Sequence, residues 1–358
     1  MASVGNGHIA SVVYSDTLYM NGLYNGKLRT YAHQHYTQLM VTEIEIIRTQ
    51  NIGNDSLNHV DSWADKWTKG RIEVGGDTEL NTLVHSSMYY TLSSLPSTDP
   101  NQPNEPFYGL SPEGLANGDN STDFRGHVLI DMEAWMYPSE SGVSGDELSF
   151  GEVNHEFITA DIAFAARQYI SATRDLNWLR RDSGYTFIRD LANFLQSMAL
   201  WNDVKAAYEI NVSAVVKEVD AILLGFPLMF EMNETVRRSD LAIYENLTDP
   251  KSSAMTWAMF AINLLEIGDT EKAFKYFQKS HSSYPRKPFN VSGEGDINFS
   301  GMGTFLQTLI YGYAGARLHV EKLTFEPKLP KNVTSLHFLG LDYLETTFDL
   351  YINNWYDW

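Results

Sequence analysis

The chain has 358 residues, a net charge of −19 at pH 7 and no cysteine. This length suits two domains or one large domain, since domains usually run to about 100–200 residues. The lack of cysteine excludes disulfides and Cys-ligated metals. Because the negative charge opposes binding to phosphate backbones and no apolar run approaches the roughly 18 residues of a membrane span, we expect neither nucleic acid nor membrane as a partner.

The first 70 residues are predicted to be β-rich. Short apolar runs lie on either side of Ser15-Asp16, and Asn-Gly pairs at Asn21-Gly22 and Asn25-Gly26 are typical of tight hairpin turns. The stretch 38–47 contains β-branched residues and alternates in its later part, which predicts a strand. We therefore expect an N-terminal β-domain over residues 1–70.

From residue 77 the hydrophobic period changes to that of a helix. Leu80, Leu83, Val84 and Thr91 fall on one face, and Asp77 is placed to cap the helix. Residues 97–126 are rich in Pro, Gly, Asn and Asp and predict a long loop. Loops of that length inside a compact domain are often functional.

The middle and end of the chain predict helices followed by strands. Apolar residues at helical spacing predict helices over 157–170, 185–198, 254–265, 271–279 and 303–313. Short strands are expected at 320–325, 333–338 and 347–352. The order β, α, β favours a helical domain over 71–317 with a C-terminal β segment over 318–358, and it argues against a βαβ fold.

The densest group of chemically active side chains lies in residues 109–138. Asp131, Glu133 and Trp135 alternate, so in an extended stretch they share one face. Carboxylates can hydrogen-bond paired sugar hydroxyls while the ring covers an apolar sugar face. A solvated acidic loop beside a core tryptophan explains the same residues equally well, and the residues alone leave both interpretations open.

Two further segments carry candidate residues. Lys217 and Glu218 precede an apolar run, which is typical of a solvated helix end, although both side chains could instead point into a cleft. Glu294 lies in a Gly-rich stretch over 288–303, where it suits either a catalytic base or an acidic turn. The histidines at 85, 127 and 155 lack metal-ligand spacing, so we expect no metal.

These three segments also resemble glycoside hydrolase family 65, in its acid-trehalase-like branch. The resemblance implies a mainly α fold: an (α/α)6 six-hairpin barrel, here incomplete, between a truncated N-terminal β-sandwich and a small C-terminal β segment. It also implies a carbohydrate partner and no cofactor. The matching stretches are 4–26, 108–118, 125–138, 158–176, 215–227, 240–262, 288–307 and 323–338.

The resemblance implies inverting hydrolysis of an α-glucosidic bond in a glucosylgalactosyl-hydroxylysine or trehalose-like disaccharide unit. Such chemistry needs one carboxylic acid to protonate the leaving oxygen and a second carboxylate to activate water. By resemblance, Asp131 of the HVFWD-type motif holds glucose hydroxyls, the KQ-type pair falls on Lys217 and Glu218, and Glu294 is the general base. Ile130 stands where the family usually has tryptophan.

The departures from the family pattern concern the general acid. The family's acid is a Glu in a PDEYH-type segment, which is absent from residues 199–216, and Glu209 there has no matching neighbours. Because general acid catalysis is typically worth ~10²–10⁴-fold, we expect strongly reduced or absent hydrolysis. The alternatives are a non-catalytic carbohydrate-binding relative and a phosphorylase, the latter disfavoured because Glu294 and Asp296 would repel phosphate.

The location of the chain is expected to be cytoplasmic. The first ten residues have neither the basic nor the apolar region of a signal peptide. Asn-x-Ser/Thr sequons, including those at Asn120 and Asn290, would carry surface glycans only in a secreted chain.

Overall fold

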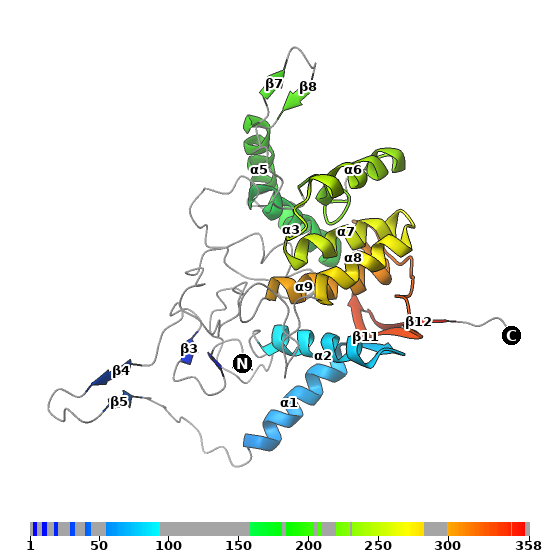
Figure 1. Ribbon diagram of the computed structural model, residues 1–358. Coiled ribbons are helices and arrows are strands. Elements are labelled where there is room, and N and C mark those ends of the chain that lie inside the picture. Colours follow the sequence, from blue (N-terminus) through cyan, green and yellow to red (C-terminus); the bar gives the residue numbers. More distant parts are fainter. Residues whose placement is uncertain are drawn as a thin grey trace.

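The computed structural model describes residues 3–5, 9–12, 18–20, 29–32, 40–43, 55–93, 158–180, 184–198, 200–202, 207–209, 220–229, 231–282, 299–344 and 346–354. Within these residues the chain is mostly helical, with a few small strands (Figure 1). The structure therefore agrees with the expected mainly α class.

The described strands near the N-terminus form two small antiparallel sheets. One has the order β1-β2-β3 and the other pairs β4 with β5. These strands lie within the range that the sequence predicts to be β-rich. Their bounds are β1 Ser3–Gly5, β2 Ile9–Val12, β3 Leu18–Met20, β4 Arg29–Ala32 and β5 Met40–Glu43.

Helix α1 (Asp55–Lys69) departs from the expectation that residues 1–70 are β-rich. The helix is mostly polar, so its periodicity depends on a few side chains. Trp63 packs on Tyr89 of α2 with ring centroids 5.0 Å apart, and Trp67 packs on His85 at 5.6 Å. Two rings four residues apart are a weak periodic signal, which explains why the sequence does not predict this helix.

Helix α2 (Thr78–Ser93) begins where the sequence predicts. The Asp77 Oδ1 atom accepts a hydrogen bond from the Leu80 amide at 2.9 Å, which confirms the expected cap. Leu80, Leu83 and Val84 are buried. The buried face of α2 lies against strand β6 (Arg71–Gly75) and helix α9.

The central part of the chain contains α3 to α6. Helix α6 is not predicted, because Leu241 is its one buried residue and the rest of the helix is largely polar. The other elements include the expected helices near 157–170 and 185–198. The bounds are α3 Ile158–Thr173, α4 Leu176–Arg180, α5 Gly184–Met198, β7 Leu200–Asn202, β8 Ala207–Glu209, the 3₁₀ helix η3 Asp220–Leu224 and α6 Glu234–Leu247.

The core is centred on α7 (Ala254–Glu266), which is buried nearly all round, as the sequence predicts. It lies against α8 (Thr270–Ser282), α9 (Phe299–Gln307) and the π-helical segment η4 (Thr308–Tyr313). Aromatic rings join these elements: Phe277 stacks on Phe305 with centroids 5.7 Å apart and meets Tyr313 edge to face at 5.2 Å. The described aromatic side chains here fill the core.

The C-terminal strands join the start of the helical region. Strand β11 (Ser335–Tyr343) pairs with β12 (Thr346–Asn353) on one side and with β6 on the other, all antiparallel. The short strands β9 (Arg317–Leu318) and β10 (Leu323–Thr324) pair with each other. Residues about 260 positions apart thus share one sheet, whose inner face packs onto the helices (Figure 1).

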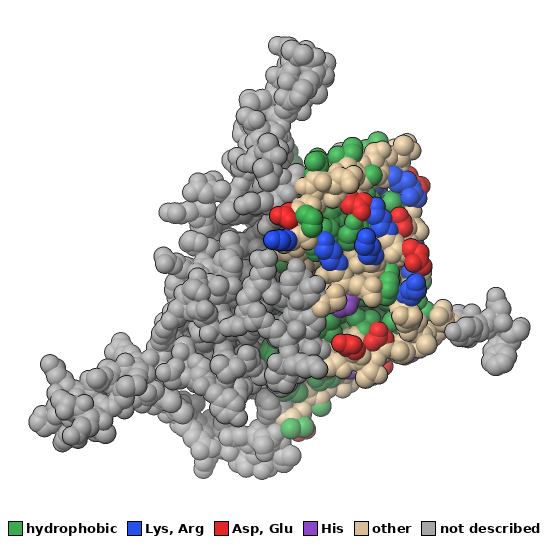
Figure 2. Space-filling view, in the orientation of Figure 1, with side chains coloured by type: hydrophobic (Ala, Val, Ile, Leu, Met, Phe, Trp, Pro, Cys, Tyr) green, Lys and Arg blue, Asp and Glu red, His purple; other side chains and the backbone are tan. Residues whose placement is uncertain are grey.

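The outer face of α6 and α8 is charged. Figure 2 shows basic and acidic side chains interspersed there. No described helix is long and apolar enough to cross a membrane.

Candidate functional site

The residues that the sequence nominates for the sugar site lie outside the described residues, as does the loop over 97–126. The structure does describe the elements that adjoin these segments. Helix η3 begins shortly after Lys217 and Glu218, α9 begins shortly after Glu294, and α2 ends before the loop. The nominated residues are Ile130, Asp131, Glu133, Trp135, Lys217, Glu218 and Glu294.

The three adjoining elements belong to one packed block. Helix α9 packs against both α2 and α7, and α7 also contacts η3. The described side chains at this junction hold the turn after η3, helix α6 and the strand that begins at Arg317 onto α7. We call this set the anchor; it consists of Phe226, Arg237, Asn263, Glu266 and Arg317.

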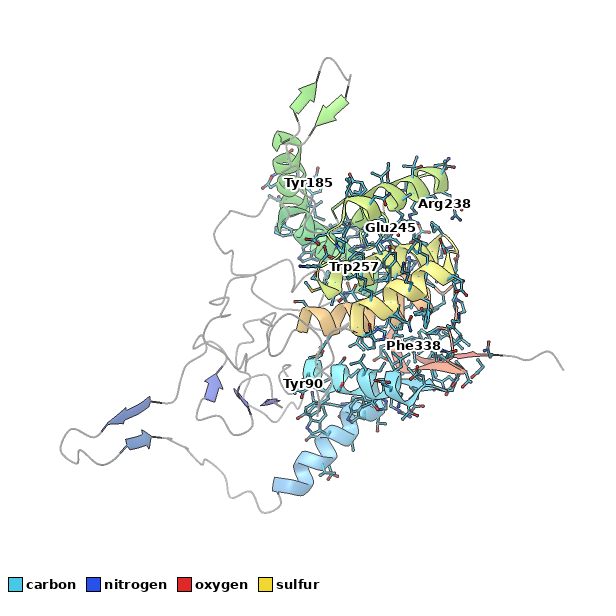
Figure 3. The ribbon with its side chains drawn as sticks, viewed as in Figure 1. Tyr90, Tyr185, Arg238, Glu245, Trp257 and Phe338 are labelled. Atoms are coloured by element: carbon cyan, nitrogen blue, oxygen red, sulfur yellow. The ribbon has the colours of Figure 1, made fainter. Side chains whose placement is uncertain are left out.

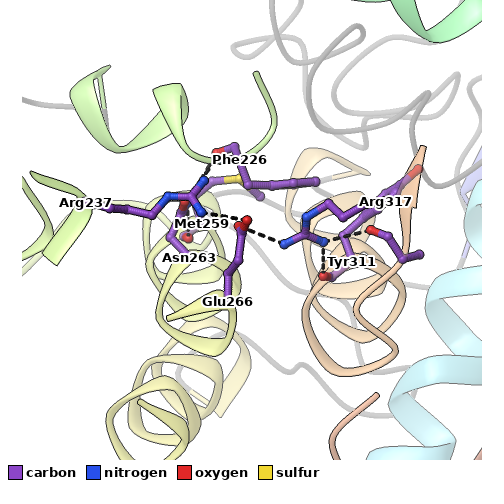
Figure 4. Close-up of polar contacts among 8 residues, drawn as sticks. Phe226, Arg237, Met259, Asn263, Glu266, Tyr311 and Arg317 are labelled. Carbon is purple, nitrogen blue, oxygen red and sulfur yellow. Dashed lines mark hydrogen bonds and ion pairs between the residues drawn. The ribbon is translucent and has the colours of Figure 1, made fainter. Parts of the chain in front are cut away.

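Asn263 holds the turn that follows η3. Its Oδ1 atom accepts from the Phe226 amide at 2.9 Å, and its Nδ2 atom donates to the Phe226 carbonyl at 3.3 Å and the Met259 carbonyl at 3.0 Å (Figure 4). Asn263 is 1% exposed, so these hydrogen bonds take the place of hydrogen bonds to water. A Cβ at Gly225 would lie 2.2 Å from Oδ1, so only glycine allows this approach.

Glu266 lies between two arginines from different elements. Its Oε1 atom is 2.6 Å from Arg237 of α6, and its Oε2 atom is 3.0 Å from Arg317 of β9 (Figure 4). Burial alone would raise the pKa of Glu266, but Arg317 and Arg237 outweigh it and hold the pKa below its ordinary value. The carboxylate is therefore ionised at neutral pH and joins α6, α7 and β9.

Arg317 also fixes the end of η4. Its guanidinium donates to the carbonyls of Tyr311 at 2.5 Å and Ala316 at 2.7 Å, and it lies 5.1 Å from the centroid of the Phe226 ring. Burial raises the pKa of Tyr311 to about 12, so its hydroxyl stays protonated. On the other side of the turn, Arg167 of α3 donates to the Leu228 carbonyl at 2.5 Å.

A hollow lies beside the anchor, between α3, the turn after η3 and β9. The free space at this hollow is about 290 Å³, a volume that includes space open to solvent. The residues that line it are Arg167, Gln168, Ser171, Phe226, Pro227, Met229, Tyr311, Ala316, Arg317 and Leu318.

A second polar cluster lies between α6 and α8 and serves packing. Glu245 contacts both Lys272 and the Tyr276 hydroxyl, and Tyr276 stacks on Trp257 with centroids 5.3 Å apart. Figure 3 labels Glu245 and Trp257 at this cluster. Burial and the neighbouring Glu245 raise the pKa of Tyr276. Because Trp257 is only 3% exposed and Lys279 covers its ring at 3.1 Å, this ring offers no free face to a sugar.

His281 of α8 also has a packing role. His281 lies 4.6 Å from Phe277 and 5.4 Å from Phe305, measured between ring centroids, and burial lowers its pKa to about 4. The imidazole is therefore neutral at pH 7. Among the described residues, no three His, Asp or Glu side chains are grouped to hold a metal ion.

Comparisons with known proteins identify relatives among glycosidases. The protein-glucosylgalactosylhydroxylysine glucosidase of Danio rerio is 30% identical over 417 aligned positions, which cover 84% of this chain and 64% of the relative. The corresponding protein of Dictyostelium discoideum is 28% identical, and the alignment covers 88% of this chain and 61% of the relative. The chain is a homologue of these glycosidases.

More distant matches extend the same group. A kojibiose hydrolase of Mucilaginibacter mallensis is 23% identical, covering 81% of this chain and 58% of the relative. The chain thus spans less than two thirds of the length of these curated relatives. No family model matches the chain.

A solved structure supports the fold. It belongs to a candidate kojibiose phosphorylase from the human microbiome and aligns with a TM-score of 0.64 at 11% identity, over 85% of this chain and 59% of that one. The described helices are therefore compatible with a helical-barrel fold.

Proposed function

We propose that this chain is a member of glycoside hydrolase family 65 that recognises an α-glucosyl disaccharide unit but hydrolyses it slowly. The observation that carries the proposal is the alignment with the Danio rerio glucosidase. It extends over 417 positions, more than the 358 residues of this chain, so it includes positions that only the relative has. This supports an internally shortened barrel, in keeping with the missing general-acid segment.

The proposed chemistry is inversion at the anomeric carbon of glucose. Glu294 takes a proton from water as the water attacks, and in an intact site an acid protonates the leaving oxygen from the other side, about 6.5–9.5 Å away. Asp131 and Glu133 hydrogen-bond the glucose hydroxyls, and Trp135 covers an apolar face of the sugar. Ile130, Lys217 and Glu218 complete the proposed subsite around the glucosyl group.

The anchor has a positioning role in this proposal. The turn at Phe226 follows the segment of Lys217 and Glu218, and α9 follows the segment of Glu294. Asn263 holds the turn at Phe226 onto α7, and α9 packs against the same helix. The described core thus provides a rigid base for both segments.

Phosphorolysis is the second candidate reaction. It is favoured by the similarity to the candidate kojibiose phosphorylase and to a Geobacillus stearothermophilus α,α-trehalose phosphorylase, which is 30% identical over 130 residues. The acidic Glu294 and Asp296 oppose a bound phosphate.

The test is to incubate the purified protein with glucosylgalactosyl-hydroxylysine, kojibiose and trehalose, with and without phosphate, and to measure glucose and glucose 1-phosphate. We expect calorimetric binding of at least one disaccharide, weakened in Asp131→Asn, with little glucose released. Rapid release of glucose would contradict the impaired site, and phosphate-dependent glucose 1-phosphate would establish the phosphorylase instead. No binding of any of the three would contradict the proposed recognition.

A further inference from the structure

The hollow beside the anchor is surrounded by more positive than negative charge. Arg167 and Arg317 line it, and Arg317 shares the carboxylate of Glu266 with Arg237. Among the described residues, Glu266 is the carboxylate that pairs with this group, and it is shared between Arg237 and Arg317. Positive charge that is withdrawn from water without a counter-ion is costly.

Hydrogen-bond donors at the hollow also lack acceptors. The Ser171 hydroxyl is buried, its residue being 1% exposed, and it has no hydrogen-bond partner within the described part of the chain; the same holds for the Arg317 Nε atom. Arg167 also lines the hollow, and its Nη1 atom donates a hydrogen bond to the Leu228 carbonyl. Three donor-bearing side chains, those of Arg167, Ser171 and Arg317, therefore line the same hollow.

The remaining walls are apolar. Phe226, Pro227 and Leu318 line the hollow, so a strongly hydrated ion would have to give up much of its water to enter. A weakly hydrated, small anion loses less by entering and accepts hydrogen bonds from guanidinium and hydroxyl groups. A neutral water molecule would satisfy the donors but would leave the positive charge uncompensated.

We propose that this hollow is a binding site for a small inorganic anion, chloride in particular, held by Arg167, Ser171 and Arg317. This proposal does not depend on the proposed activity. Because Phe226 and Pro227 form one of its walls, the bound anion stabilises the turn that follows Lys217 and Glu218.

The experiment compares the purified chain in sodium chloride and in sodium gluconate at equal ionic strength. We expect the melting temperature to be about 2 °C or more higher in chloride, since a ligand that binds only the folded state stabilises it. We also expect the chloride-35 NMR line to broaden with protein concentration.

Two variants and one control make the test specific. Ser171→Ala and Arg167→Gln should lose the chloride-dependent shift and the line broadening. Arg238→Gln, which removes an exposed arginine paired with Glu234, should keep both. If Arg167→Gln fails to fold, the milder substitution Ser171→Ala still tests whether the chloride-dependent shift needs this hollow. Equal melting temperatures of the wild type in the two salts, without line broadening, would overturn the proposal.

Discussion

At the scale of single residues, Glu266 is where three elements are held together. It pairs with Arg237 and Arg317, and all three side chains are mostly buried, with 27%, 15% and 12% of their surfaces exposed. Replacing Glu266 by glutamine would leave two guanidinium groups without a counter-charge. Breaking a buried pair in this way is usually far more harmful than losing a surface pair.

We expect Glu266→Gln to lower the free energy of unfolding by about 2–4 kcal/mol, somewhat less than for a fully buried pair because some solvent reaches the group. The matched control is Glu234→Gln, which removes an exposed pair with Arg238 and should cost under about 1 kcal/mol. Chemical denaturation at pH 7 measures both. Equal, small effects of the two substitutions would show that the buried pair contributes little.

The same residue predicts a pH dependence. The pKa of Glu266 is lower in the folded chain than its ordinary value of 4.5. Its stabilising contribution is therefore fully present above about pH 4.5 and is lost as the pH falls through the folded pKa. The difference in stability between wild type and Glu266→Gln should shrink below pH 4.5, and a constant difference down to pH 3 would be contrary to this explanation.

At the scale of elements, the C-terminal sheet closes the helical region. Leu336 of β11 lies opposite Val74 of β6 and Ile352 of β12 and is 0% exposed. We expect Leu336→Ala to lower the free energy of unfolding by about 2–5 kcal/mol, because it leaves a cavity where strands from both ends of the helical region meet.

The control for this prediction is Val320→Ala. Val320 is 52% exposed, and its truncation should change the stability by no more than about 0.5 kcal/mol. Thermal unfolding of both variants provides the comparison. If Leu336→Ala were as mild as Val320→Ala, the sheet would not be part of the cooperative core.

Elements with a strong hydrophobic pattern were predictable from the sequence. The helix expected at 254–265 is α7 at Ala254–Glu266, because a helix buried all round is apolar all round. Helices α1 and α6 were missed because they are mostly polar, with few side chains that show a period. The pairing of β6 with β11 was also missed, since nothing local in either strand specifies a partner so far along the chain.

The candidate site was predictable only in part. Its acidic and aromatic residues follow from sugar chemistry and from the family motifs, and their placement stays a prediction. The anchor was not foreseen, because it depends on contacts between distant residues: Asn263 and Phe226 are 37 positions apart, and Glu266 and Arg317 are 51 apart. A buried asparagine within the apolar α7 was the one available signal.

At the scale of the whole molecule, we propose that a glycosidase scaffold has kept its base and lost its acid. The described core is continuous and packed, and the chain is homologous to glycosidases along 84% of its length. The proposed defect is therefore specific to one catalytic step, the protonation of a poor alkoxide leaving group.

The most direct test is the hydrolysis of α-glucosyl fluoride beside that of glucosylgalactosyl-hydroxylysine. Fluoride leaves without protonation, so water activated by Glu294 can attack the anomeric carbon and release glucose and fluoride. We predict that kcat/KM for the fluoride exceeds that for the disaccharide by at least about 10²-fold, that Glu294→Gln abolishes this hydrolysis, and that Glu234→Gln preserves it. Comparable rates on both substrates would contradict the account, as would inertness towards the fluoride.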